Sequence, residues 1–292
     1  MAPNSSSGAV VMDANIVVLN RGYDQTFQTR EQSLIETLAG YGELAVSFSG
    51  RLESCYSMDL CRASGIRIRA ITLDSPTRSR KEVARAKRYC QRYGIEQRVI
   101  KTDEMIFCDH LRHLNEVIDP VRYICHLTAL ETDWSHLPML LPAPVEELQE
   151  YLRRFGSLPT NTLWLFAKQG MTHRDFRYGF NKRQLGRWGK SAHGCLSYRF
   201  SDPELVERRH LRMVDMAEQM LADMGLEEAQ VFFHTLADRA TTLARVRVRV
   251  PARLRAQAFD LQPDILTALK STAFDLVTLD MAAEEERQEL VV

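Results

Sequence analysis

The 292-residue sequence has no run approaching the eighteen or so apolar residues that a membrane-spanning helix needs. Its small, polar start and the short apolar run at 15–20 do not match a signal peptide. Neither sign of charge is in excess, with 38 Lys+Arg against 38 Asp+Glu, which argues against a nucleic-acid coat protein. These absences predict a cytoplasmic protein with no membrane partner, and nucleic acid is not expected as a partner.

Paired cysteines are also missing. The six cysteines contain no Cys-x-x-Cys pair, and their spacing suits neither a zinc ribbon nor a small disulfide scaffold. In a reducing compartment, most should be buried thiols. This is the better interpretation for Cys55, Cys61 and Cys90, which occupy helical positions on apolar faces, while Cys108 is uninformative.

What the sequence does contain is an ordinary globular composition, 45% hydrophobic and 26% charged, with strands and helices in alternation. Strands are predicted at 43–50, 66–73 and 97–100, and helices at 32–39, 53–64 and 79–93. This order predicts an α/β fold built on a parallel sheet. Ligands of such sheets bind at the carboxyl ends of the strands, so the loops at 48–54 and 74–80 are the candidate site.

The rest of the chain predicts a different organisation. Residues 1–30 are expected as a loosely attached leader, 31–195 as the α/β domain and 196–292 as a smaller C-terminal α+β domain. The segment 140–145 is interpreted as a break between elements. The further elements predicted are helices at 146–155, 171–185, 203–224 and 254–269, and strands at 230–234, 243–250 and 275–280.

The loop Ser47-Phe-Ser-Gly-Arg-Leu-Glu-Ser54 carries the most chemical information. A strand that opens into a Ser/Gly turn at a helix start presents backbone N–H groups that bind phosphate. Gly50 permits close approach of an anion, the hydroxyls of Ser49 and Ser54 can donate, and Glu53 is suited to hold a magnesium ion. The alternative is a plain helix start with Ser49 as its cap. No Gly-Lys-Ser/Thr follows, so this is not a Walker A loop.

Ala45-Val-Ser-Phe-Ser-Gly-Arg-Leu-Glu-Ser54 resembles the Ser-Gly-Gly-x-Asp-Ser loop of the PP-loop ATP pyrophosphatases, which cleave ATP to AMP and pyrophosphate. The resemblance is greatest to LarE-type sulfur transferases and covers roughly residues 30–105 and 170–280. Its other motifs are Ile71-Thr-Leu-Asp-Ser-Pro-Thr-Arg-Ser-Arg-Lys-Glu82, Ile100-Lys-Thr-Asp-Glu-Met105 and Gly194-Cys-Leu-Ser-Tyr-Arg199.

The resemblance implies a PP-loop (adenine nucleotide alpha hydrolase) sheet, ATP and Mg²⁺ as cofactors, a small-molecule substrate and a homo-oligomer. The implied nucleotide-binding residues are Ser47, Phe48, Ser49, Gly50, Arg51, Glu53, Ser54, Asp74, Ser75 and Arg80. Glu53 is the implied metal ligand, and the substrate or its phosphate would meet Lys190, Ser197 and Arg199.

The resemblance also implies that Cys195 is a sulfur donor or persulfide carrier. Basic residues near Cys195 in the sequence favour its thiolate. Cys125 corresponds to the second cysteine of the family's Cys-Tyr-Phe-Cys pair. It is a candidate resolving thiol, or equally a buried one. Two cysteines cannot hold a three-cysteine iron–sulfur cluster. The sulfur would come from Cys195 itself or from the persulfide of a cysteine desulfurase.

Two stretches are strongly basic: residues 51–101 contain thirteen Lys/Arg against five Asp/Glu, and residues 168–212 contain eleven against four. They suit a triphosphate or a phosphorylated substrate, or are simply solvated helix faces. His173 and His193 are candidate acid–base groups, although isolated histidines more often only form hydrogen bonds.

The departures from the family motif keep alternatives open. Arg51 stands where the loop has its second glycine, Glu53 stands where it has aspartate, and the Gly-Thr-Asn-x-Asp-Asp segment has no good counterpart. The leading prediction is an ATP-dependent sulfur transferase that adenylates a small-molecule carboxylate or carbonyl oxygen. The alternatives are a nucleobase or tRNA thiolation enzyme, an amide-forming relative, and a degenerate nucleotide-binding subunit without turnover.

Overall fold

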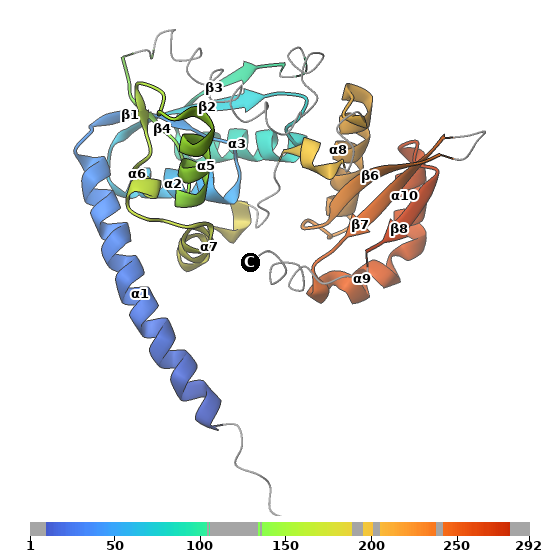
Figure 1. Cartoon of the computed structure of the whole chain (residues 1–292), viewed down its shortest axis with the longest axis horizontal. Helices are drawn as coiled ribbons and strands as arrows, with labels where there is room; N and C mark the ends of the chain where they lie inside the picture. The colour runs from blue at the N-terminus through green and yellow to red at the C-terminus, as the bar shows by residue number, and fades with distance from the viewer. Residues whose placement is uncertain are drawn as a thin grey trace, which may run out of the picture.

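The computed structural model describes residues 10–103, 105, 134, 136–188, 195–200, 205–237 and 242–280, with the side chains of 10–21, 236–237, 242–247 and 252 left out. Five residues named above lie outside the described residues: Cys108, Cys125, Lys190, His193 and Gly194. The described chain forms two sheets side by side, each with its own helices (Figure 1).

The first sheet has five strands in the order β3-β2-β1-β4-β5, and every neighbouring pair is parallel. Its strands are β1 (Glu43–Ser47), β2 (Arg67–Asp74), β3 (Glu96–Lys101), β4 (Met139–Leu140) and β5 (Thr162–Leu163). The accompanying helices are α1 (Val10–Ala39), α2 (Leu52–Ala63), α3 (Arg80–Tyr93), α5 (Val145–Phe155), α6 (Leu165–Lys168) and α7 (His173–Lys182). The predicted α/β class is therefore confirmed.

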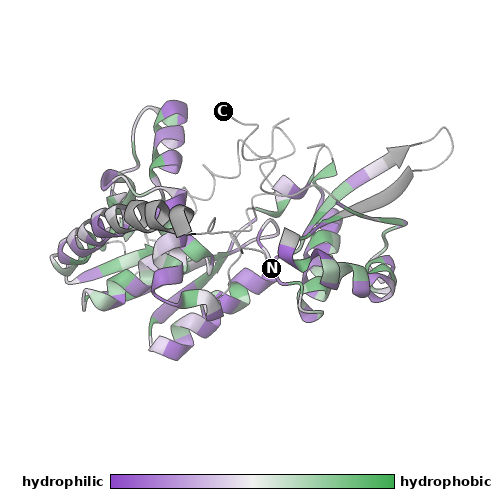
Figure 2. Ribbon diagram, turned by 90° about the horizontal axis from the view of Figure 1, so that it is seen from below, coloured by the Kyte–Doolittle hydropathy of each residue, from purple (hydrophilic) through white to green (hydrophobic). Residues whose placement is uncertain are grey.

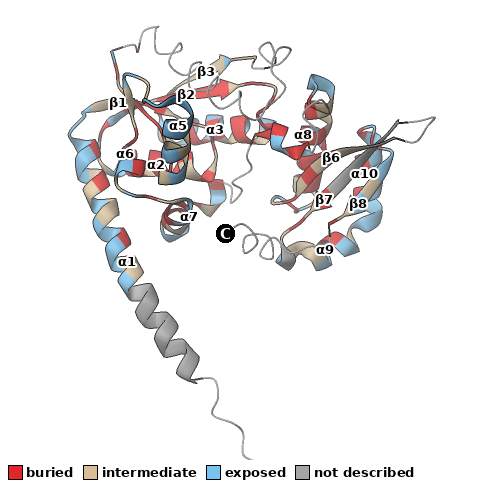
Figure 3. Ribbon diagram, viewed as in Figure 1, coloured by how far each residue is buried: buried red, intermediate tan, exposed pale blue. Residues whose placement is uncertain are grey.

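The three central side chains of β1 are all buried but join two different cores, which shows that helices cover both faces of this sheet. Leu44 and Val46 belong to a core that α1, α2, α3 and α7 complete, whereas Ala45 between them joins a second core beneath α5. In Figure 3, buried residues gather in the strands and on the helix sides that meet them. The chain order reverses between β1 and β4, which makes their carboxyl ends the switch point of a doubly wound sheet.

The second sheet has three strands in the order β6-β7-β8. Strands β6 (Gln230–Ala237) and β7 (Thr242–Arg249) are antiparallel, and β8 (Leu276–Leu279) runs parallel to β7. The helices α8 (Arg208–Asp223), α9 (Arg255–Asp260) and α10 (Gln262–Ser271) complete this part, together with the 3-10 turns η3 (Leu196–Arg199) and η5 (Ala252–Leu254). Figure 2 shows α-helices banded in hydrophilic and hydrophobic residues, as amphipathic packing requires.

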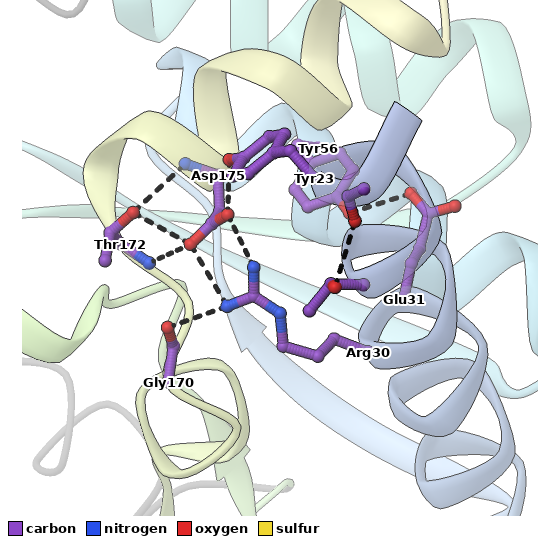
Figure 4. Close-up of polar contacts among 9 residues, drawn as sticks. Tyr23, Arg30, Glu31, Tyr56, Gly170, Thr172 and Asp175 are labelled. Atoms are coloured by element: carbon purple, nitrogen blue, oxygen red, sulfur yellow. Dashed lines mark hydrogen bonds and ion pairs between the residues drawn. The ribbon is translucent and has the colours of Figure 1, made fainter. Parts of the chain in front are cut away.

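The helix expected at 32–39 is the last part of the much longer α1. Part of the expected leader is thus well anchored. The side chain of Phe27 is fully buried in the core, and Tyr23 and Arg30 bind Asp175 of α7 (Figure 4). This contact joins residues about 150 positions apart, which a local sequence pattern does not reveal.

Asp175 is the centre of the polar contacts in Figure 4. Its carboxylate accepts hydrogen bonds from the Tyr23 hydroxyl at 2.5 Å, from Arg30 Nη2 at 2.8 Å, and from the backbone N–H and hydroxyl of Thr172, both at 2.8 Å. Burial opposes ionisation, but these donors outweigh it and lower the pKa of Asp175. Burial and the same carboxylate raise the pKa of Tyr23 to about 12. The contact is a structural clamp between α1 and α7.

Several predicted elements differ from the structure. The strand predicted at 43–50 ends at Ser47, and the helix predicted at 171–185 is the shorter α7, followed by a separate 3-10 turn, η2 (Leu185–Trp188). The segment 140–145 is not only a break, because Leu140 ends β4, which lies between β1 and β5 in the sheet, and is fully buried there. The helix predicted at 254–269 is divided into α9 and α10, since Pro263 in the first turn of α10 cannot donate a backbone hydrogen bond. Helix α8 begins at Arg208, later than predicted, and ends near Gly225 as predicted.

Within the described residues, the structure contains no helix with the length and apolar character needed to cross a bilayer. The predicted burial of three thiols is confirmed, with Cys55, Cys61 and Cys90 at most 2% exposed. Burial raises the pKa of Cys61 and of Cys90 to about 12, so both thiols are inert near neutral pH.

Candidate functional site

The loop between β1 and α2 is held in place mainly through its backbone. The carbonyl oxygen of Phe48 accepts from the Thr72 hydroxyl at 2.7 Å, that of Ser49 from Arg78 Nη1 at 3.3 Å, and that of Gly50 from Arg85 Nη1 at 3.1 Å. The Phe48 side chain belongs to the core, 1% exposed. Any ligand contact by Phe48 must therefore use its backbone.

Gly50 is required at its position for two reasons. Its φ of +76° is a left-handed conformation, and a Cβ there would lie 2.4 Å from the carbonyl oxygen of Glu82. The glycine therefore lets the loop pack directly against the first turn of α3. The sequence predicts that Gly50 allows an anion to approach the backbone. In the structure, it is the backbone of α3 that approaches Gly50 closely.

The two loop hydroxyls bind one another. Ser49 Oγ and Ser54 Oγ are 2.9 Å apart, the Ser54 hydroxyl donates to the Arg51 carbonyl at 3.0 Å, and the Arg51 N–H donates to Ser49 Oγ at 3.2 Å. Arg51 is the N-cap residue of α2, and its side chain makes no capping hydrogen bond. The first turn of α2 therefore has no cap from its N-cap side chain, and the Glu53 backbone N–H binds the Glu53 carboxylate, which leaves the other first-turn N–H groups as the candidates for binding an anion.

Glu53 lies in that first turn, with its side chain 13% exposed. Its Oε1 is 3.7 Å from Nδ1 of His173, the first residue of α7. Burial would raise the pKa of Glu53, but His173 and the Arg51 guanidinium outweigh it, and the pKa is lowered. Glu53 in turn raises the pKa of His173, with help from Glu147 of α5. An ionised carboxylate thus stands at the switch point of the sheet.

The loop after β2 is closed on itself by an arginine. Arg80 forms an ion pair with Asp74, and its Nη2 donates to the carbonyl oxygens of Ser75 at 2.6 Å and Arg78 at 3.0 Å. The Ser75 and Thr77 hydroxyls lie 3.2 Å apart and are buried. Of the predicted nucleotide residues here, Asp74 and Arg80 bind each other, and Arg80 still has a half-exposed side chain.

Cys195 lies directly against this second loop. Its thiol faces the Thr77 carbonyl oxygen at 3.5 Å and accepts a hydrogen bond from the Ser197 hydroxyl at 2.9 Å. The N–H of Leu196 donates to the same carbonyl at 2.9 Å. Cys195 is 4% exposed. The loop cysteine, expected between two domains, is therefore anchored at the carboxyl end of the parallel sheet.

Three separate segments predicted to act together are thus neighbours. The loop at 48–51 contacts the loop at 75–79 through Arg78, and 75–79 contacts 195–197 through Thr77. Arg78 and Thr77 were not predicted individually, although both fall in the loop at 74–80 that the strand order singled out. Arg85, from the next turns of α3, had no sequence signal.

Arg199 is placed differently from a phosphate ligand. It is 4% exposed, and its Nε donates to Glu218 Oε1 of α8 at 2.8 Å in a buried ion pair. The N-terminus of α3 is likewise occupied from α8, because Asp215 Oδ1 accepts the Arg80 N–H at 3.1 Å. Burial raises the pKa of Asp215 against the opposing effect of the Ser79 and Arg80 donors. The Asp215 contact fixes α8 against the first part of the chain, whereas the Arg199–Glu218 ion pair joins η3 to α8 within the second part.

The described residues contain no group of three or more His, Cys, Asp or Glu side chains arranged to hold a metal ion. A single carboxylate such as that of Glu53 is nevertheless compatible with the expected Mg²⁺ site. Mg²⁺ commonly binds one or two protein carboxylates and completes its coordination shell with phosphate oxygens and water. Comparisons with known family models and with curated proteins find no match for this chain.

Proposed function

We propose that this chain is an ATP-dependent sulfur transferase of the PP-loop ATP pyrophosphatase type. It adenylates a carboxylate or carbonyl oxygen of a small molecule and delivers sulfur through Cys195, in the cytoplasm. The observation that supports the proposal most is the meeting of the loops at 48–51, 75–79 and 195–197 at the carboxyl end of a doubly wound sheet. That edge is where such sheets bind ligands.

In this proposal, the start of α2 binds phosphate through its backbone N–H groups, with Arg51 beside it. Glu53 is the carboxylate that fits Mg²⁺, because the neighbouring His173 and Arg51 keep it ionised. ATP supplies the chemical activation when bound: AMP is a good leaving group, whereas a carboxylate or carbonyl oxygen is a poor one.

The Cys195 thiol is the nucleophile or sulfur carrier of the proposal. Its 4% exposure protects a reactive sulfur from solvent, and the hydrogen bond from Ser197 orients that sulfur. Ser197 is thus a positioning residue here. Arg199 positions α8 through Glu218 and has no direct part in binding phosphate.

The test is incubation of the protein with Mg²⁺, ATP and a panel of small aliphatic and aromatic carboxylates. AMP and pyrophosphate are measured by chromatography, and the Cys195 peptide by mass spectrometry. The proposal predicts equimolar AMP and pyrophosphate, with sulfur lost from Cys195, or with sulfur added to Cys195 when a persulfide donor is included in the incubation. The Cys195→Ser variant should still bind nucleotide and should lose sulfur transfer, while Cys61→Ser, at a fully buried thiol, serves as the control. Unchanged sulfur transfer by Cys195→Ser would contradict the proposal.

A second candidate is a nucleotide-binding subunit without turnover. It is favoured by the mutual hydrogen bond of Ser49 and Ser54 and by the ion pair of Asp74 with Arg80, which use groups that a catalytic loop would direct to the ligand. In that case the same incubation gives tight ATP binding and no pyrophosphate with any member of the panel.

A further inference from the structure

A cavity of about 390 Å³ lies between α3 and α8, where the two parts of the chain meet. This volume is within the usual range for small-molecule sites. Its lining residues are Ser79, Lys81, Glu82, Ala84, Arg85 and Arg88 from α3 and its cap, and Gln219, Ala222, Asp223 and Glu227 from α8 and the turn that follows it. The cavity is distinct from the Cys195 thiol and from Glu53.

The α3 wall of this cavity carries three basic side chains, together with the buried carboxylate of Glu82. Lys81, Arg85 and Arg88 are spaced four and three residues apart, which places them along one face of the helix. Lys81 Nζ donates to the carbonyl oxygen of Glu218 at 2.8 Å, and Arg85 Nη1 donates to that of Gly50 at 3.1 Å. The first bond holds Lys81 against α8, and the second holds Arg85 against the loop before α2. Both side chains therefore keep their positive charge at fixed positions along this wall.

The opposite wall is acidic. Asp223 and Glu227 come from the last turn of α8 and the turn that follows, and Gln219 lies one helical turn before Asp223. Gln219 Nε2 donates to Asp223 Oδ1 at 2.7 Å, which holds that carboxylate. The cavity therefore has one side with an excess of positive charge and one side with two exposed carboxylates, each supplied by a different part of the chain.

We propose that this cavity binds a small organic zwitterion, with a carboxylate against the α3 wall and an ammonium group against the α8 wall. A polyphosphate would meet the carboxylates of Asp223 and Glu227, and a simple amine would meet the arginines, so each is repelled by one wall. A ligand with separated opposite charges satisfies both. This inference does not rest on the proposed sulfur-transfer function.

The test uses ω-amino acids from β-alanine to 6-aminohexanoate, with hexanoate and hexylamine as singly charged probes. Binding to the full-length protein is followed by saturation-transfer difference NMR. One chain length should bind best, because the walls set the distance between the charges, and both singly charged probes should bind at least about tenfold more weakly. Binding of hexanoate or hexylamine equal to the zwitterions, or no binding by any member, overturns the proposal.

Variants of exposed lining residues sharpen the test, because they should fold normally. Arg88→Asp and Asp223→Arg should each weaken the best zwitterion by about tenfold or more, and the double exchange should restore binding with the ligand reversed. Lys87→Ala, on α3 but outside the cavity lining, is the control and should bind like the unaltered protein. Full binding by both single variants contradicts the proposed site.

Discussion

Two carboxylates close to the first turn of α7 show how different polar environments in this protein can be. Asp175 is 3% exposed and accepts hydrogen bonds from three side chains and the backbone (Figure 4). Glu53 is 13% exposed, and its Oε1 lies 3.7 Å from Nδ1 of the half-exposed His173. Both carboxyl groups have a lowered pKa.

The two carboxylates differ in how fully their hydrogen-bonding capacity is used within the protein. The donors around Asp175 all come from the protein and complete its hydrogen bonding, so the group contributes to stability and cannot reach a ligand. Glu53 is ionised by neighbouring charge at a looser distance, at the edge of the sheet where ligands bind. The many hydrogen bonds to Asp175 are therefore typical of a structural contact, whereas the Glu53–His173 pair, which has fewer, lies in the candidate site.

The largest expected effect comes from breaking the clamp. Asp175→Ala leaves Arg30 and Tyr23 without their partner and should lower the free energy of unfolding by about 3 kcal/mol. Glu150→Ala is the control, because the Glu150 carboxylate also binds two arginines but is exposed on α5. Thermal denaturation should show a large fall in Tm for the first variant and little change for the second. Equal falls in Tm for the two variants would mean that the buried clamp stabilises the protein no more than an exposed ion pair does.

The second-largest effect is expected from a substitution of Gly50 in the loop between β1 and α2. Gly50→Ala combines a left-handed backbone with a backbone clash and should cost at least about 2 kcal/mol. Gly65→Ala tests the strain alone, since its φ is +75° and nothing lies within 4 Å of the added Cβ. Denaturation midpoints should fall further for Gly50→Ala, and its affinity for ATP should fall as well. Equal losses from both glycines would mean that the packing against α3 contributes nothing.

A smaller effect, about 1.4 kcal/mol, is expected on activity from Glu53→Gln. Loss of the negative charge should slow pyrophosphate release about tenfold and leave Tm nearly unchanged. Glu53→Asp keeps the charge and should retain most of the rate. The measurement is release of pyrophosphate at saturating Mg²⁺ and ATP. A Glu53→Gln variant as fast as the unaltered protein would remove Glu53 from the site.

The smallest effect concerns pH. The pKa of His173 is raised above 6.5, so its contribution is complete below pH 6.5 and is lost as pH rises through the folded value. The pKa of Glu53 is lowered below 4.5, so its contribution is present above pH 4.5 and is lost as pH falls through the folded value. His173→Ala should therefore destabilise most between about pH 4.5 and 6.5, by about 0.5 kcal/mol. Denaturation at pH 5.5 and pH 8.5 tests this, and an equal loss at both values would exclude a charged pair.

Much of the fold could be predicted from local sequence, because the elements β1 to β3 and α2 to α3 have clear periodicity and glycine boundaries. Strands β4 and β5 have two residues each and contain no period to detect. They form because Met139 and Leu140 are fully buried in the sheet, which is a tertiary effect. The division between α9 and α10 was within reach, since Pro263 was visible in the sequence.

The candidate site was predicted as a set of loops more accurately than as a set of side chains. Strand order alone indicated 48–54 and 74–80, and the structure describes them in contact. The partners of individual residues depend on how α8 packs: Asp215 lies 135 residues from Arg80, and Glu218 lies 19 residues from Arg199. For this reason the sequence could not reveal that Asp215 accepts a hydrogen bond from the Arg80 N–H, or that Glu218 forms an ion pair with Arg199.

The central claim is that the three loops form one nucleotide-dependent site. Hydrogen–deuterium exchange of the full-length protein, with and without Mg²⁺ and ATP, tests it directly. The account predicts that amides at 51–54, 75–79 and 195–200 exchange more slowly together when nucleotide is present, while those of α1 around the Asp175 clamp do not change. Protection confined to other segments, or none with ATP at saturating concentration, would contradict it.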